Sequence, residues 1–261
     1  MCVVDGLMVV AAPRCDIPAR MVSMAHLYAG TSGFAYDTWK PDFYPAGVSS
    51  KKYLSVYAQR LNSVEINYTY HRLPSVNSME GWVEQTPASF VFVLKAHQKL
   101  THIFRLKKNE FTQVFFQAID PLRTARRLGA VLFQLPPNMK LDLDLLAGFL
   151  DEVPADVRLA FEFRHPSWLV EPLYELLAQR GVALCWAESE KLVVPERITA
   201  DFTYFRLRKE SYSPEERAEL GHRVDKLLAA GKDTFVFYKH EDTPAGALYA
   251  EELLKREIAR G

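Results

Sequence analysis

Four charged side chains, Glu65, Lys95, Glu162 and Arg206, lie within short apolar runs, where a lone charge would be costly. The two glutamates could act as general acid and base on a sugar, or bind a divalent metal ion. A lysine with cationic neighbours could form a Schiff base with a carbonyl compound. The structural alternatives are ion pairs, Glu65 with Lys95 and Glu162 with Arg164. The residue types indicate a site and leave its reaction open.

Further candidate ligand-binding residues share a position at or just beyond the end of an apolar run. They are Asn67, His97, Gln134, Arg164, His165, Trp168, Arg206, Arg208, His240 and Gly246. Basic groups in this set outnumber the two glutamates, so we expect a substrate that carries a phosphate or carboxylate. Gly246 stands near the start of the last expected helix, whose free N–H groups could bind a phosphate. His165 precedes a proline, and shaping that turn is its structural alternative.

Eight apolar runs must position these residues, and most of the intervals between them can hold a helix. The runs cover residues 27–33, 63–70, 90–97, 128–136, 159–165, 183–188, 202–208 and 234–240. Eight strand-then-helix units predict an α/β fold, a TIM-like (β/α)8 barrel with eight parallel strands. We expect irregular helices after the second and sixth strands. Such a barrel brings the ends of all its strands to one mouth, where active sites of this fold lie.

Composition limits the class of protein further. The chain has 261 residues, with 32 basic and 32 acidic side chains and no net charge, so attraction of the whole protein to nucleic acid or an anionic membrane is not expected. Three cysteines form no paired framework, which favours the cytoplasm. No apolar run reaches the length that spans a bilayer. We predict one barrel domain, residues 24–261, after a disordered or extended segment, residues 1–23, and the sequence leaves the oligomeric state open.

Several of these stretches occur together, in order, in one known family. They include Gly-Thr-Ser-Gly-Phe at 30–34, Val-Glu-Ile-Asn at 64–67, Gln-Leu-Pro-Pro at 134–137, Phe-Glu-Phe-Arg-His-Pro-Ser-Trp at 161–168 and Tyr-Phe-Arg-Leu at 204–207, with Tyr70, Lys95, Thr101, His102 and Gly246 between and after them. From about residue 27 to 257 the chain resembles the YecE-like family, domain of unknown function 72. The resemblance implies a TIM-barrel fold and no particular activity.

Two stretches depart from the commonest pattern of that family. A His-Gly pair usually follows the seventh strand, and Arg208-Lys209 stands there in this chain. The eighth strand often ends in an aromatic residue and two asparagines, and here it ends Tyr238-Lys239-His240. Both departures fall at the expected mouth, so we expect the substrate to differ between branches of the family.

Two functional hypotheses follow. The first is an enzyme acting on a small anionic substrate, such as a phosphate ester, a nucleotide or a phosphorylated sugar, with metal-assisted hydrolysis or isomerisation as the reaction if a divalent metal ion is bound. The second, less favoured, is a non-catalytic module that binds a nucleotide or single-stranded nucleic acid. In that module an aromatic loop with Tyr36, Trp39, Phe43 and Tyr44 would stack on bases, unless it forms a hydrophobic lid or a small core of its own.

Overall fold

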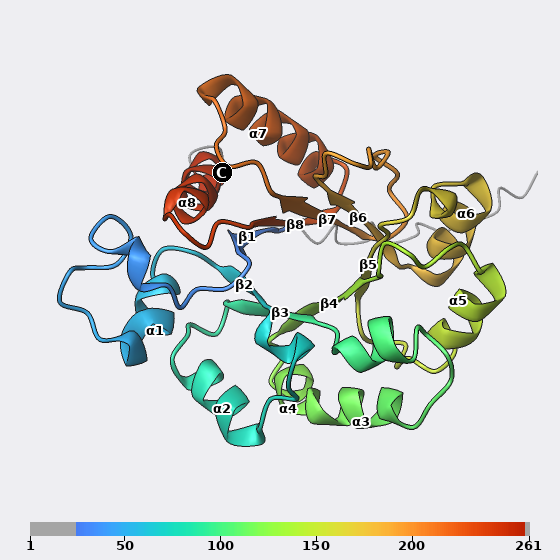
Figure 1. The fold of residues 1–261 in the computed structure, drawn as a ribbon. Helices are drawn as coiled ribbons and strands as arrows, with labels where there is room; N and C mark the ends of the chain where they lie inside the picture. The colour runs from blue at the N-terminus through green and yellow to red at the C-terminus, as the bar shows by residue number, and fades with distance from the viewer. Residues whose placement is uncertain (1–24, 259–261) are drawn as a thin grey trace, which may run out of the picture.

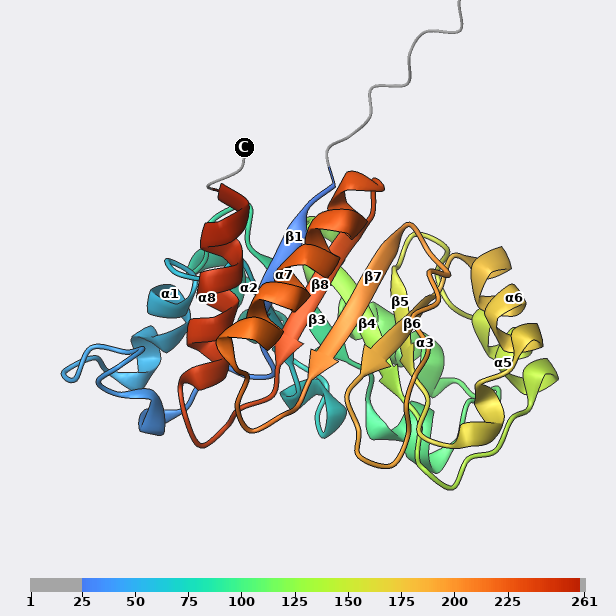
Figure 2. The same cartoon turned by 90° about the horizontal axis from the view of Figure 1, so that it is seen from above.

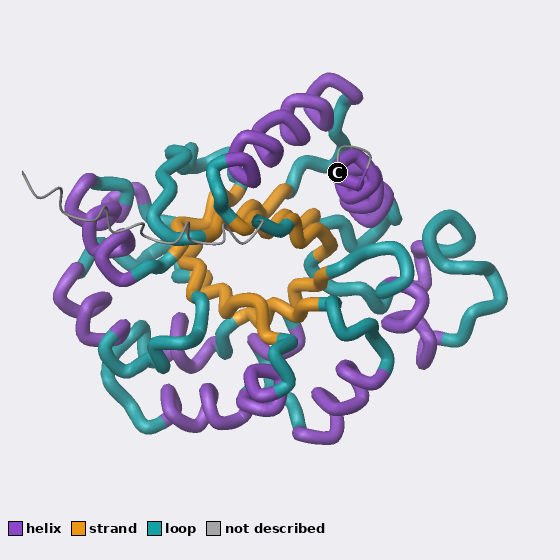
Figure 3. The backbone as a smooth tube through the Cα atoms, turned by 180° about the vertical axis from the view of Figure 1, so that it is seen from behind, coloured by secondary structure: helices purple, strands orange, loops and turns teal. Residues whose placement is uncertain are grey.

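The computed structural model describes residues 25–258, so the predicted N-terminal segment, residues 1–23, lies outside the described part. Eight parallel strands alternate with helices and form the predicted barrel (Figures 1 and 3). The strands are β1 Leu27–Thr31, β2 Ser63–Ile66, β3 Val91–Lys95, β4 Leu128–Gln134, β5 Leu159–Glu162, β6 Ala183–Ala187, β7 Phe202–Leu207 and β8 Asp233–Tyr238. Their order in the sheet is β1-β8-β7-β6-β5-β4-β3-β2, the order of a sheet that winds around an axis.

The barrel closes between β1 and β2 with side chains in place of a regular ladder. A single bridge, Ser32 to Glu65, joins the backbones there. Below it the Tyr57 hydroxyl accepts a hydrogen bond from the Thr31 N–H at 2.8 Å and donates one to the Ser63 carbonyl at 3.0 Å. The Asn62 amide accepts from the N–H of Ala29 and donates to the carbonyl of Leu27. These two side chains form hydrogen bonds with backbone N–H and C=O groups of β1 and β2 that have no ladder partner between the two strands.

The helices lie outside the strands, as Figure 2 shows for α7 and α8 beside β7 and β8. They are α1 Tyr53–Tyr57, α2 Val76–Glu84, α3 Phe111–Ala118, α4 Asp120–Thr124, α5 Leu143–Leu150, α6 Glu171–Arg180, α7 Pro214–Ala229 and α8 Ala245–Ile258. Asp142 accepts the N-capping hydrogen bond of α5, and Ser213 forms a capping box at the start of α7. Both are residue types that favour a helix start, and Pro214 follows Ser213 at the first helical position.

Three helical regions differ from what the local sequence pattern indicates. The pattern over about residues 109–127 favours one helix, and the structure has two, because Pro121 opens α4 immediately after α3 ends. Ser167, the expected N-cap of α6, lies in a separate 3-10 turn, and Val170 is the N-cap. The segment 188–201 after β6 holds no helix, whereas α2 after β2 is a regular nine-residue helix.

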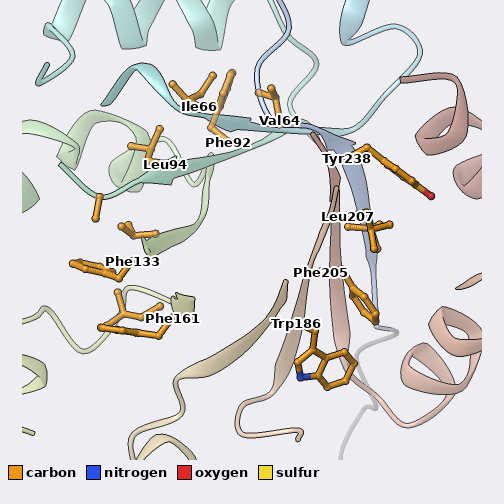
Figure 4. Close-up of a cluster of buried hydrophobic side chains, with 14 of the residues drawn as sticks. Val64, Ile66, Phe92, Leu94, Phe133, Phe161, Trp186, Phe205, Leu207 and Tyr238 are labelled. Atoms are coloured by element: carbon orange, nitrogen blue, oxygen red, sulfur yellow. The ribbon is translucent and has the colours of Figure 1, made fainter. Parts of the chain in front are cut away.

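The two faces of the strands differ in what they bury. Outward side chains such as Phe92, Phe133, Phe161 and Phe205 point away from the barrel axis and pack under the helices (Figure 4). The inner face carries small residues on β4 to β6, such as Ala130 and Cys185, opposite the aromatic rings of β7 and β8. This inner apolar layer fills the barrel, so that polar groups are confined to the ends of the strands. Within residues 25–258 no helix has both the length and the apolar character needed to cross a membrane.

Candidate active site at the barrel mouth

Glu65 lies at the centre of the mouth and is completely buried. Its two carboxylate oxygens accept hydrogen bonds from Arg206 Nε at 2.9 Å and Nη2 at 2.6 Å, a bidentate pair. The Tyr204 hydroxyl donates to Oε2 at 2.6 Å and the Ser32 hydroxyl donates to Oε1 at 2.7 Å. Three donors from β7 and one from Ser32, just beyond β1, therefore hold one carboxylate of β2.

Glu162 is the second buried carboxylate, and it shares Arg206 with Glu65. Arg206 Nη1 donates to Glu162 Oε2 at 2.6 Å, while the Gln134 amide donates to both oxygens at 2.9 Å. Arg208 Nη2 donates at 2.7 Å and Arg164 Nε at 2.9 Å from the solvent side. The predicted convergence of Glu65, Glu162 and Arg206 is confirmed, and so is the Glu162–Arg164 pair. We call Glu65, Glu162, Arg206, Tyr204 and Gln134 the ion-pair ring.

Electrostatics keep both carboxylates of the ion-pair ring ionised. Burial alone would raise the pKa of Glu65, but the charge and hydrogen bonds of Arg206 outweigh it and lower that pKa below its usual value. Burial acts in the same direction on Glu162, where Arg206, Arg208 and Arg164 together hold the pKa far below its usual range. The pKa of Arg206 is raised, because the two carboxylates overcome the effect of its burial. Near neutral pH neither glutamate carries a proton to donate.

Lys95 lies at the end of β3 and is not paired with Glu65, so that expectation was wrong. The register explains the difference. Glu65 pairs with Val93 across the β2–β3 ladder, which puts Lys95 two residues, about 7 Å, further toward the mouth. The Lys95 amine instead lies 4.5 Å from the centre of the Tyr70 ring. Burial and the charge of Arg206 lower the pKa of Lys95 to about 8, although Glu65 and Glu162 act in the opposite direction.

A second layer of partly exposed residues lies above the ion-pair ring, and we call Lys95, Arg164, Arg208, Tyr70 and His102 the rim. The side chains of Arg164 and Arg208 are 35% and 22% exposed, against 2% for Arg206. The His102 ring lies 5.3 Å from that of Tyr70. Burial, followed by the charges of Lys95 and Arg164, lowers the pKa of His102. Lys95 and Arg164 therefore lie close enough to His102 for their charges to act on it.

The backbone beneath His102 is unusual. A π-helical turn, Lys99–Ile103, is followed by Arg105 and Leu106, both in the left-handed region at φ 51° and 64°. Such conformations cost free energy in residues other than glycine, and they persist where surrounding contacts impose them. Here Leu106 is buried and the Arg105 guanidinium donates to the Asn138 carbonyl at 3.1 Å. The strained segment fixes the position of His102 at the mouth.

Other predicted site residues have structural contacts in this conformation. The His165 ring caps the turn that contains Ser167, as its structural alternative implied. Trp168 is fully buried and donates to the Met139 carbonyl at 2.8 Å, so it offers a ligand no surface. His97 is bonded to the backbone of His71 and Lys99.

Residues predicted for the site in the loop after β8 also have structural contacts. The His240 ring is hydrogen-bonded to the Lys209 carbonyl, which ties this loop to the one after β7. A side chain at Gly246 would come within 2.8 Å of Tyr238, so a glycine lets α8 approach β8 closely. The expected phosphate site of Gly246 stays a prediction. Two buried polar atoms nearer the ion-pair ring, Asn67 Oδ1 and Arg208 Nε, have no hydrogen-bond partner among the described residues.

The aromatic loop forms a small core of its own. Trp39 and Tyr44 are fully buried, Phe43 is 2% exposed, and their rings stack or meet edge to face. Tyr36 is only partly buried. Three of the four rings therefore have no face free to stack on a base, and this weakens the nucleic-acid hypothesis.

The donor set at the mouth does not fit a metal ion. All four oxygens of Glu65 and Glu162 already accept hydrogen bonds from cationic or neutral donors. Among residues 25–258, no three His, Cys, Asp or Glu side chains gather as metal ligands would. A cation placed here would also face three guanidinium groups. We therefore derive no chemistry from a bound metal.

A cavity of about 690 Å³ lies on the outer side of β6 and β7, next to Arg223 of α7. Its floor is apolar, with Trp186, Phe205 and Leu207, and the segment 188–196 borders it. The neighbouring Glu188 is occupied, because it accepts hydrogen bonds from the backbone N–H groups of Arg208 and Lys209. The barrel mouth, where unmatched charge gathers, is the stronger candidate for chemistry.

Sequence reasoning missed four members of the site: Ser32, Tyr70, His102 and Tyr204. Ser32, Tyr70 and Tyr204 read as parts of apolar runs, and His102 stands in a connection between strand and helix. A signal was present, because all four belong to the stretches shared with the YecE-like family.

The eight parallel strands, with a charged candidate site at their carboxyl ends, place this chain in the class of TIM-barrel proteins. Within that class the chain belongs to the DUF72 family, whose model, described as "Protein of unknown function DUF72", matches residues 28–260. The predicted resemblance is thereby confirmed.

Individual relatives agree with this assignment. The chain is 29% identical over 171 residues to the UPF0759 protein YunF of Bacillus subtilis, which covers 62% of this chain and 59% of YunF. It is 29% identical over 158 residues to the UPF0759 protein YecE of Escherichia coli, covering 60% and 55% of the two chains. The match thus spans less than three fifths of these curated relatives. A crystal structure of a DUF72 family protein from Thermotoga maritima superposes with a TM-score of 0.79 at 30% identity, covering 89% of this chain and 99% of the other.

Proposed function

We propose that this protein binds a small anionic substrate at the carboxyl-terminal mouth of its barrel and acts on it there as an enzyme. The charge balance of the mouth carries this proposal. Two ionised glutamates face four cations, Lys95, Arg164, Arg206 and Arg208, so that two positive charges are left unmatched. A carboxylate or phosphate would compensate them and find bidentate donors in the guanidinium groups.

The roles within the mouth divide between the two layers. Glu65 and Glu162 hold Arg206, and Glu162 also orients Arg164 and Arg208 toward the space above it. Saturated, ionised carboxylates are poor general acids, so we assign the chemistry to the rim, where Lys95 and His102 have lowered pKa values. Asn67 and Arg208 contribute polar atoms that lack a partner among residues 25–258.

Nucleic acid is the less favoured ligand. The chain as a whole carries no net charge, and the rings best placed to stack on bases are buried in the aromatic loop. A small anionic ligand could be bound by the few positive charges of the mouth alone.

Titration with inorganic phosphate, followed by calorimetry at low ionic strength, tests the proposal. We expect saturable binding that weakens by about tenfold in Arg164→Met and in Arg208→Met, since each removes a charge-assisted hydrogen bond. Arg123→Met is the matched control, because Arg123 pairs with Asp120 and Asp156 away from the mouth. Binding that is equal in all four proteins would overturn the proposal.

A further inference from the structure

Lys95 differs from the other three cations of the mouth. Each of the three arginines donates hydrogen bonds to a glutamate, whereas the Lys95 amine has no hydrogen bond or ion pair to any residue that the structure describes. Arg206 binds both oxygens of Glu65, and Lys95 lies two residues further toward the mouth than Glu65. Lys95 is partly buried, and its amine lies over the face of Tyr70, 4.5 Å from the centre of the ring.

The surroundings of Lys95 favour the neutral form of its amine. Burial, then the positive charge of Arg206, lowers the pKa of Lys95 to about 8, while Glu65 and Glu162 raise it and Arg164 lowers it. About half of the amines are therefore neutral at pH 8, compared with well under one in a hundred for an ordinary lysine side chain. A neutral amine beside cationic neighbours is the arrangement that activates lysine toward carbonyl carbon.

We propose that Lys95 forms an imine with a small aldehyde or ketone that carries a phosphate or carboxylate group. The proposal rests on the proposed function, because Arg164 and Arg208 hold the anionic group while the carbonyl carbon meets the amine. It narrows the substrate class to carbonyl compounds and makes Lys95 a catalytic residue.

The step balances without an oxidant or reductant. The amine lone pair forms a bond to the carbonyl carbon, and the carbonyl π electrons move to oxygen, which takes up a proton. The nitrogen loses a proton, which gives the carbinolamine. Its hydroxyl is protonated and leaves as water while the nitrogen lone pair forms the C=N bond, and loss of the second N–H proton gives the imine. His102 is placed to carry these protons, because its ring adjoins Tyr70 and its lowered pKa keeps the imidazole neutral near pH 7.

Reductive trapping tests the imine. The full chain is incubated at pH 8 with cyanoborohydride and either dihydroxyacetone phosphate or dihydroxyacetone, and the adducts are located by mass spectrometry of peptides. Pyruvate and acetone form a second pair, with carboxylate in place of phosphate. We expect an adduct on Lys95 that is at least about tenfold more abundant with the anionic member of each pair.

Three variants complete the design. Lys95→Arg keeps the positive charge and is expected to lose the adduct, with its fold checked by circular dichroism. Lys99→Met is the matched control, because Lys99 also lies over an aromatic ring, 4.7 Å from Phe111, yet is exposed. It should retain the Lys95 adduct, whereas Arg164→Met should reduce the yield about tenfold.

The outcomes separate the two proposals. Phosphate binding without an adduct on Lys95 overturns the imine and leaves the proposed function standing. Loss of both phosphate binding and adduct means that the proposed function itself is wrong. An adduct formed equally from neutral compounds, or spread evenly over exposed lysines, overturns the anionic carbonyl class.

Discussion

The ion-pair ring and the rim lie one above the other at the same mouth, and they differ in how their charges are matched. In the ring each charged group is buried and bonded on every side, as the four donors around Glu65 illustrate. In the rim the cations outnumber the anions and stay partly exposed. Buried charges must be paired if the fold is to form, whereas unmatched exposed charge is available for a ligand. The comparison separates the residues of the ring, which stabilise the fold of the mouth, from the residues of the rim, which are available to bind a ligand.

The largest expected effect tests the ring. Arg206→Met leaves two buried carboxylates without their shared partner, so we expect a loss of about 3–5 kcal/mol in the free energy of unfolding. Urea denaturation followed by circular dichroism measures it. The triple change with Glu65→Gln and Glu162→Gln should recover part of that loss, because the ion-pair ring then holds no charge. A single variant as stable as the wild type would show that the ring does not hold the mouth together.

A smaller effect is expected from pH. Because the folded-state pKa values of Glu65 and Glu162 lie below those of the unfolded chain, their stabilising contribution is fully present above about pH 4.3. It is lost progressively as the pH falls from there through the folded-state values. The midpoint of thermal unfolding should therefore fall less steeply below pH 4.3 in Glu162→Gln than in the wild type. Parallel curves for the two proteins would contradict the assignment.

The smallest expected effect belongs to the rim. Arg164→Met removes an ion pair whose guanidinium is 35% exposed, so the free energy of unfolding should change by no more than about 1 kcal/mol. The same urea titration measures this value beside that of Arg206→Met. A loss as large as that of Arg206→Met would erase the distinction between the two layers.

Much of the fold and the convergence of the site could be predicted from the sequence. Alternation along Val64-Glu65-Ile66-Asn67 and Phe161-Glu162-Phe163 shows which side chains face inward, and the barrel brings them together. Alternation does not show how far along the axis each group lies. That distance depends on the register between neighbouring strands, and for this reason Lys95 could not be separated from Glu65 in advance.

Other features depend on contacts that residue types do not reveal. Tyr204 looks like a core aromatic residue until its hydroxyl is seen to meet Glu65. The place of His102 depends on a π-helical turn and two left-handed residues, for which the sequence holds no glycine as a signal. Sequence patterns therefore predicted that Glu65, Glu162 and Arg206 converge, but not which contacts each of them makes.

The closure between β1 and β2 has a consequence for how the molecule can be manipulated. Tyr57 and Asn62 lie in the segment that connects these two strands. The side chains that close the barrel are therefore near β1 and β2 in sequence, although the barrel as a whole is built from distant segments. Tyr57→Phe removes the hydroxyl that bridges β1 and β2, and it changes no residue of the ion-pair ring or the rim. We expect this change to weaken the closure without removing a hydrogen-bond donor or acceptor of the ion-pair ring.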